Sequence, residues 1–82
     1  MKIILKKQPK KYLESVPESI RAKLLKGLEQ ITKHEGDIVS LKGYRNRYRY
    51  KVAHYRIVFD RMDDGEIVII VIEINTRTNI HY

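Results

Sequence analysis

Residues 42–61, KGYRNRYRYKVAHYRIVFDR, bring together side chains that could bind and act on a polyanion. Seven of these residues are Lys or Arg, and Asp60 is their only acid. Because a β-strand points successive side chains to opposite faces, Arg47, Arg49 and Lys51 would share one face. Like charges on one face repel, so a phosphate-rich partner accounts for the pattern better than folding alone. The alternative is a solvated outer face that keeps a small basic protein in solution.

The same cations suit a ribonuclease-type transfer, since the sequence offers neither paired carboxylates nor metal-ligand spacing. In that reaction the 2′-OH of RNA attacks the adjacent phosphate and leaves a cyclic phosphate and a free 5′-OH. Arg56 and Arg77 could clamp the phosphate oxygens in bidentate fashion, which the guanidinium fork allows. Histidine titrates near neutrality, and a cationic surrounding lowers the pKa of tyrosine and lysine. The candidates for proton transfer are His81, Tyr82, Lys51 and Glu73.

Each of these assignments has a structural alternative. Arg56 and Glu73 would also make an ordinary ion pair across two strands. His81 and Tyr82 end the sequence, where fraying is common.

Length and composition predict one soluble domain over residues 1–82. Seventeen Lys and Arg against ten Asp and Glu give a net charge of +7, which points to nucleic acid, the ribosome or an acidic protein as partner. Cysteine is absent, which suits a reducing cytoplasm, and three scattered histidines give no reason to expect a metal or another cofactor. The first apolar run, residues 3–5, is too short for a signal peptide, and the longest, residues 67–72, is too short for a membrane span. We therefore expect a cytoplasmic protein without a membrane partner.

The apolar pattern predicts an α+β protein whose helices pack on one face of a single sheet. Pro17 fits the first position of a helix, and Gly36 fits its C-terminal stop. Gly27 weakens that helix by roughly 1 kcal/mol relative to alanine, so another element is expected to approach it closely. The expected elements are a short strand at 1–7, a helical turn at 10–16, a helix at 18–35, a loop at 37–42, and an antiparallel three-strand meander at 47–52, 55–62 and 66–75.

Turns at Ala53-His54 and Asp64-Gly65 fix the expected register of the meander. They place Lys51 opposite Arg56, and Arg56 opposite Glu73. The helix-facing side then holds Tyr48, Tyr50, Val52, Tyr55, Ile57, Phe59, Ile70, Ile72 and Ile74. The opposite side holds Arg47, Arg49, Lys51, Arg56 and Glu73, and Asn75 and Arg77 continue it. A one-residue slip would invert the faces of a strand, so the cationic side depends on these turns.

Several short motifs follow one another along the chain: Leu41-Lys42-Gly43, YRYKV at residues 48–52, Tyr55-Arg56, and an arginine followed near the end by a tyrosine. With the order of elements, they make the sequence similar to the RelE/ParE toxin superfamily, close to its RelE branch, over essentially the whole chain. The resemblance implies substrate-binding cations at Arg49 and Lys51 and catalytic arginines at Arg56 and Arg77. It also implies a catalytic role for Tyr82 or His81, and this His-Tyr ending is similar to the YoeB branch as well.

Members of the RelE branch are toxins of type II toxin–antitoxin modules that cut mRNA in the ribosomal A site without a metal. The resemblance therefore implies a ribosome-dependent mRNA endonuclease, in which Lys51 is also a candidate for catalysis and Arg47, Arg45 and Lys42 add contacts to RNA. Its partners would be a cognate antitoxin and the ribosome with mRNA in the A site. The chain would be monomeric alone and a hetero-oligomer with the antitoxin. The alternatives are a ParE-like DNA gyrase inhibitor without nuclease activity and a relative that only binds.

Overall fold

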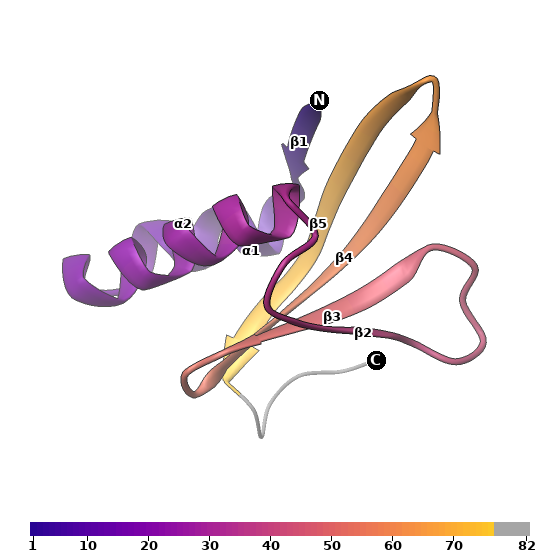
Figure 1. The fold of residues 1–82 in the computed structure, drawn as a ribbon. Helices are drawn as coiled ribbons and strands as arrows, with labels where there is room; N and C mark the ends of the chain where they lie inside the picture. Colours follow the sequence, from indigo (N-terminus) through magenta and orange to yellow (C-terminus); the bar gives the residue numbers. More distant parts are fainter. Residues whose placement is uncertain (77–82) are drawn as a thin grey trace.

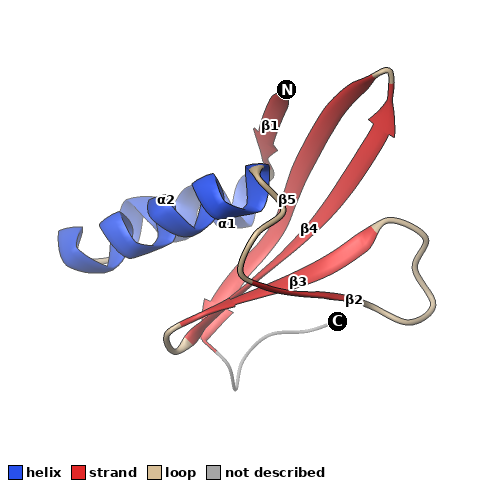
Figure 2. Ribbon diagram, viewed as in Figure 1, coloured by secondary structure: helices blue, strands red, loops and turns tan. Residues whose placement is uncertain are grey.

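The computed structural model describes residues 1–76, which form two helices and a five-stranded sheet (Figure 1; Figure 2). In chain order the elements are β1 (Lys2–Leu5), α1 (Lys7–Ser15), α2 (Glu18–Thr32), β2 (Asp37–Ser40), β3 (Arg47–Val52), β4 (Tyr55–Asp64) and β5 (Glu66–Thr76). Among these residues no helix is both long and apolar enough to cross a membrane. The predicted α+β class, with helices packed on one sheet, is confirmed.

The strands lie in the order β1-β5-β4-β3-β2, with β1 parallel to β5 and the other neighbouring pairs antiparallel. The sequence predicts a loop over residues 37–42, but Asp37–Ser40 form β2 and pair with β3, so this prediction is wrong. Four residues that begin with Asp and end with Ser carry no strand pattern of their own. Pairing with β3 makes this segment a strand.

Both helices differ at their ends from the prediction. Helix α1 begins at Lys7, earlier than predicted, and contains Pro9 in its first turn, where a missing N–H costs little. Helix α2 ends at Thr32, three residues before the predicted end, and Pro17 precedes its first residue. Gly36 does adopt a positive φ of +92°, but four residues beyond the end of the helix.

Arg21 of α2 ties the two helices together. Its Nε donates a hydrogen bond of 2.7 Å to the carbonyl of Leu13, and its Nη2 donates to the carbonyls of Glu14 and Val16. The last carbonyls of a helix have no partner within the helix. One guanidinium of α2 therefore satisfies the C-terminal end of α1.

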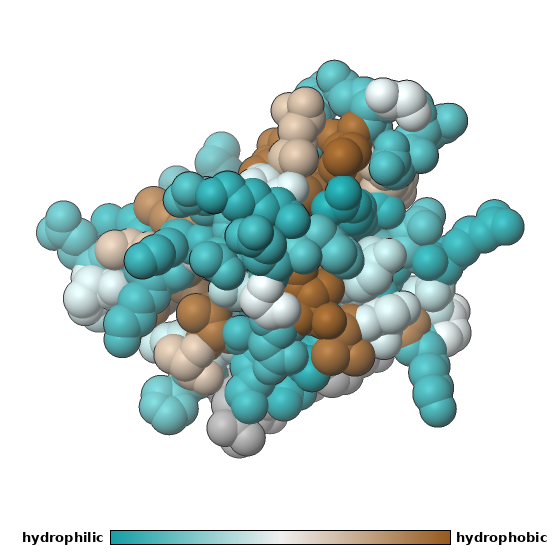
Figure 3. Space-filling view, viewed as in Figure 1, coloured by the Kyte–Doolittle hydropathy of each residue, from teal (hydrophilic) through white to brown (hydrophobic). Residues whose placement is uncertain are grey.

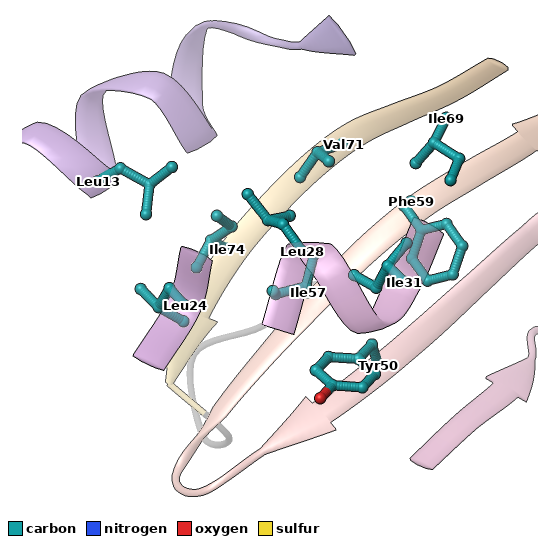
Figure 4. Close-up of a cluster of buried hydrophobic side chains, with 10 residues drawn as sticks. All are labelled: Leu13, Leu24, Leu28, Ile31, Tyr50, Ile57, Phe59, Ile69, Val71 and Ile74. Carbon is teal, nitrogen blue, oxygen red and sulfur yellow. The ribbon is translucent and has the colours of Figure 1, made fainter. Parts of the chain in front are cut away.

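The core lies between the helices and one face of the sheet (Figure 4). Helix α1 contributes one side chain, α2 contributes three, and strands β3, β4 and β5 contribute the rest. The buried cluster consists of Leu13, Leu24, Leu28, Ile31, Tyr50, Ile57, Phe59, Ile69, Val71 and Ile74.

The register between β3 and β4 is the predicted one. Lys51 pairs with Arg56 and Tyr50 with Ile57. Ala53, in the turn, adopts a positive φ of +53°, a conformation that alanine disfavours. The strong pairing on both sides of this turn imposes that conformation.

At Arg56, the register between β4 and β5 differs from the prediction by two positions. At the turn, Asp64 pairs with Glu66 around the single residue Gly65, which has a φ of +88°. The predicted two-residue turn places Asp63 opposite Glu66 and is therefore wrong. A glycine able to adopt positive φ allows the tighter turn.

A β-bulge in β5 shifts the register by the second of these two positions. Val58 pairs with Glu73 whereas the next residue, Phe59, pairs with Val71, which leaves Ile72 as the extra residue. The one-residue turn brings odd-numbered residues of β5 to the core up to Val71, and the bulge returns the alternation to even-numbered residues, so Ile74 faces the core. The buried residues of β5 are Ile69, Val71 and Ile74, so the predicted core positions Ile70 and Ile72 are wrong.

Two glycines flank the ring of Tyr50, which is 5% exposed. A Cβ on Gly27 of α2 would lie 3.0 Å from Cε2 of Tyr50, and a Cβ on Gly36 would lie 2.7 Å from Cε1. The close approach expected at Gly27 is therefore confirmed. The missing side chains let α2 and the start of β2 close on the tyrosine from both edges.

Gln8 links α1 to the last part of β5 through its side-chain amide. Its Nε2 donates to the carbonyl of Ile74 at 2.8 Å, and its Oε1 accepts from the N–H of Ile74 at 2.9 Å. Strand β1 ends before it reaches this part of β5. The last backbone hydrogen bond between the two segments runs from the N–H of Lys6 to the carbonyl of Val71. The Gln8 amide thus takes the place that a peptide group of a longer β1 would occupy.

Candidate nucleic-acid interface

The candidate site lies on the outer face of the sheet, which is the face turned away from the helices. Residues paired directly across neighbouring strands point to the same face, so the pairing register gives rows of side chains. The first row runs from β2 to β5 through Asp37, Lys51, Arg56 and Asn75. The second row runs through Val39, Arg49, Val58 and Glu73, and the third through Arg47, Asp60 and Ile70.

The predicted grouping of Arg49, Lys51 and Arg56 on one face is present. Lys51 and Arg56 are direct cross-strand partners, and Arg49 lies in the next row. The predicted pairing of Arg56 with Glu73 is wrong, because the turn and the bulge bring Asn75 opposite Arg56 instead. Two cations placed directly opposite each other destabilise a sheet unless an anion offsets them.

Arg49 is held by a carboxylate that the sequence reasoning missed. Its Nη1 lies 3.4 Å from Oδ1 of Asp37, and its side chain is 18% exposed. At that distance the two charges attract, yet Nη1 makes no hydrogen bond among the described residues. Asp37 lies on this face because residues 37–40 form β2 and not the predicted loop.

Arg47 has different surroundings from Arg49. Its Nε donates to Oδ1 of Asp60 at 2.7 Å and its Nη2 to Oδ2 at 3.1 Å, while its guanidinium carbon lies 4.5 Å from the ring centre of Tyr44. The hydrogen bond to Asp60 raises the pKa of Arg47 above its already high ordinary value. The guanidinium of Arg47 is therefore bound by Asp60 along its edge and covered by Tyr44 on one face.

Lys42 and Arg45 lie in the exposed segment that joins β2 to β3. Backbone hydrogen bonds close both ends of this segment: the N–H of Leu41 donates to the carbonyl of Arg47, and the N–H of Arg61 donates to that of Asn46. The two cations thus sit on a segment with fixed ends. Arg45 lines the same small hollow as Arg47 and Asp60 of the third row.

Three carboxylates offset the charge of the three rows. These rows contain the cations Arg47, Arg49, Lys51 and Arg56, together with the acids Asp37, Asp60 and Glu73. The sequence reading counted only Glu73. Asp60 and Asp37 contact Arg47 and Arg49, and Asp37 also lies directly opposite Lys51 at the β2 end of the first row.

Tyr48 and Tyr50 lie on the core side, as predicted. Tyr48 stacks on Phe59 with ring centres 5.5 Å apart, and its ring meets the edge of His34. Burial, with a smaller effect from Asp37, raises the pKa of Tyr50, so its hydroxyl stays protonated at neutral pH. Neither tyrosine is placed to stack on a base.

The remaining predicted catalytic residues, Arg77, His81 and Tyr82, lie outside the described residues. The surface turned to the viewer in Figure 3 is mostly hydrophilic, with apolar groups along the upper part of the β4–β5 hairpin and in a second group below the centre of the view.

No protein-family profile and no curated protein matches this chain. Chains of solved structures do, among them the following two. One is a chain of the RelB–RelE antitoxin–toxin complex from Methanococcus jannaschii, with a TM-score of 0.66 and 26% identity over 92% of this chain and 91% of that chain. The other is a chain of the archaeal RelE–RelB complex from Pyrococcus horikoshii OT3, with a TM-score of 0.73 and 22% identity over 96% of this chain and 97% of that one.

Proposed function

We propose that this chain, which has the RelE-like toxin fold, is the toxin of a type II toxin–antitoxin module and a ribosome-dependent mRNA endonuclease. The likeness to chains of two RelB–RelE complexes supports the toxin assignment. The observation that supports nuclease chemistry is the grouping of Arg49, Lys51 and Arg56 in adjacent rows of one sheet face. Lys51 and Arg56 carry like charges in directly opposite positions, and a phosphate bound between them would relieve their repulsion.

Arg49 and Lys51 hold the RNA backbone, and Arg56, with Arg77, stabilises the charge that grows on the phosphate oxygens during 2′-OH attack. Guanidinium groups suit this role because they bind two oxygens in a fixed geometry and stay charged. Loss of one such donor typically lowers a rate by about 10²–10³. The unsatisfied Nη1 of Arg49 gains a partner if a phosphate draws the side chain toward the RNA.

Proton transfer falls to His81 and Tyr82, with Lys51 and Glu73 as the other candidates. The reaction as proposed uses no metal or other cofactor. One group removes the proton of the 2′-OH, and another protonates the 5′-oxygen that leaves. Lys51 has the advantage of position, since it lies opposite Arg56 where the phosphate would bind.

The partners in this proposal are the ribosome with mRNA in its A site and a cognate antitoxin. The antitoxin segment that covers the outer face would be acidic, because it must complement Lys51 and Arg56. The chain alone would be a monomer, and its complex with the antitoxin a hetero-oligomer.

The test is to express the protein in a translating extract and to map the ends of the mRNA. We expect cleavage by the wild type, loss of cleavage in the Arg56→Ala/Arg77→Ala double variant, and normal cleavage in Lys26→Ala, which removes an exposed cation of α2. Cleavage that persists in the double variant would reject the assigned roles. Intact mRNA together with DNA damage signalling in cells would instead favour a gyrase inhibitor with the same fold.

A further inference from the structure

Tyr44 differs from the other described tyrosines in its exposure. Tyr50 is in the core, and Tyr12, Tyr48 and Tyr55 pack against it. Tyr44, in the segment between β2 and β3, is 43% exposed. Its ring lies over the guanidinium of Arg47, 4.5 Å from ring centre to guanidinium carbon. The ring of Tyr44 is therefore accessible to a ligand, whereas the rings of the other described tyrosines are held against the core.

The support beneath Tyr44 is rigid. Asp60 holds Arg47 by two hydrogen bonds from a position directly across the strands, and both groups are less than one-third exposed. The backbone bond from Leu41 to Arg47 closes the segment that carries Tyr44. The ring therefore has little conformational freedom to lose when a flat ligand binds.

A small hollow of about 190 Å³ lies beside the ring, lined by Tyr44, Arg45, Asn46, Arg47, Asp60 and Met62. It is smaller than the roughly 300–1,000 Å³ of a site for a drug-sized ligand, and so suits a single planar group. Asn46 brings an amide to its wall, a group that can both donate and accept hydrogen bonds. A flat aromatic face, an amide and a cation in one place are the groups that bind an unpaired nucleobase.

The hollow lies next to the proposed path of the RNA. Arg47 and Arg49 share the outer face two residues apart on β3, which is roughly 7 Å along a strand. A nucleotide whose phosphate is at Arg49 and Lys51 would thus have its neighbour within reach of Tyr44.

We propose that Tyr44 is the stacking platform for a nucleobase of single-stranded RNA, one nucleotide away from the phosphate bound by Arg49 and Lys51. This inference rests on the proposed function for the identity of the ligand. Arg47 and Asp60 are positioning residues, because their ion pair holds the guanidinium that packs on the ring of Tyr44.

The test uses a short single-stranded oligoribonucleotide that contains 2-aminopurine, whose fluorescence falls when it stacks. We expect wild-type protein to bind and quench the probe, and Tyr44→Phe, which keeps the ring, to match it within about twofold. Tyr44→Ala should lower the affinity roughly 5- to 150-fold and abolish the quenching, as expected on removing one stacked ring. Unchanged circular dichroism and melting would show that Tyr44→Ala folds, as its exposure predicts.

Equal binding and quenching by Tyr44→Ala, or no binding by the wild type, would overturn the inference. The mRNA-end experiment run in parallel separates this from the proposed function. Cleavage of mRNA combined with unaltered RNA binding by Tyr44→Ala would reject the stacking role of Tyr44 but not the nuclease. Binding that depends on Tyr44, without any cleavage of mRNA, supports the platform and rejects the nuclease.

Discussion

Arg47 and Arg49 are two residues apart and share a face, yet their partners differ. Arg47 makes two hydrogen bonds to Asp60, whereas within residues 1–76 the ion-pair partner of Arg49 is the more distant carboxylate of Asp37. Residue type and spacing predicted the shared face but could not distinguish these roles. The distinction depends on which carboxylate the neighbouring strands bring close.

Replacement of Asp60 by asparagine should destabilise the protein. It leaves the half-buried guanidinium of Arg47 without its anionic partner, and hydrogen bonds to charged groups contribute about 1.5–3 kcal/mol. Urea unfolding should show that the free energy of unfolding of Asp60→Asn is lower than that of the wild type by an amount in that range. Asp63→Asn, which removes the same charge from an exposed position of β4, should leave the stability nearly unchanged. Equal losses in both variants would show that net charge, not the Asp60–Arg47 pair, is responsible.

Replacement of Asp37 by asparagine should strengthen RNA binding. Arg49 is then released from a competing charge, and a partly exposed ion pair contributes up to about 1 kcal/mol, which corresponds to at most about fivefold in affinity. Titration with the 2-aminopurine oligoribonucleotide measures this change. Asp63→Asn is again the matched control, since it alters the net charge equally but away from Arg49. Weaker binding by Asp37→Asn would mean that Asp37 orients Arg49 for its ligand.

Tyr50 should make the fold sensitive to alkaline pH. Burial raises the pKa of Tyr50 above its ordinary value of 10.0. Below pH 10 the hydroxyl is protonated in both the folded and the unfolded chain, so stability is unaffected. Above pH 10 the unfolded chain ionises first, and stability falls until the folded pKa is reached. Stability measured from pH 9 to 11 should fall less steeply in Tyr50→Phe, and an identical fall would assign the effect to other groups.

At the scale of elements, the positions of the helices, β3, β4 and β5 follow from the sequence because their periodic apolar residues face a single core. The β3–β4 register was predictable because only two residues separate the strands. The β4–β5 register was not, since Gly65 permits a tighter turn and Ile72 forms a bulge that no local pattern marks. Strand β2 was also missed, and with it Asp37.

The contact between β3 and the segment that joins α2 to β2 should be sensitive to a single methyl group at Gly36. Gly36→Ala introduces both an unfavourable φ of +92° and a Cβ at 2.7 Å from the ring of Tyr50. Gly43, whose φ is +83°, has open space where a Cβ would lie, so Gly43→Ala carries the backbone strain alone. In urea unfolding, we expect the free energy of unfolding of Gly36→Ala to be about 1–3 kcal/mol lower than that of Gly43→Ala. This is a typical cost of overpacking. Similar losses would show that the ring of Tyr50 moves aside freely.

At the scale of the whole molecule, the net charge of +7 exceeds what the outer face carries. Much of the excess lies on α1, whose Lys7, Lys10 and Lys11 are exposed on the other side of the protein. The composition therefore indicates a basic protein, but the net charge of +7 is larger than the charge at the candidate site. The carboxylates Asp37 and Asp60 reduce it there.

The salt dependence of RNA binding reports how many cations take part. If Arg49, Lys51 and Arg56 neutralise three phosphates, the logarithm of the binding constant should fall with the logarithm of salt concentration with a slope of about −2, since single strands give about −0.7 per phosphate. Titrations of the oligoribonucleotide between low and moderate salt would measure it. A slope near zero would exclude phosphate binding at this face. A steeper slope that Lys10→Ala reduces would bring α1 into the interface.

Gln8 has a consequence beyond the stability of one contact. Where β1 stops, the N–H and carbonyl of Ile74 would be open to solvent, and an unpaired strand border is a template on which another polypeptide can add. The Gln8 amide occupies that border with one donor and one acceptor. A chain lacking this amide would therefore be prone to self-association through β5, so that concentration, and not temperature alone, would govern how long it stays in solution.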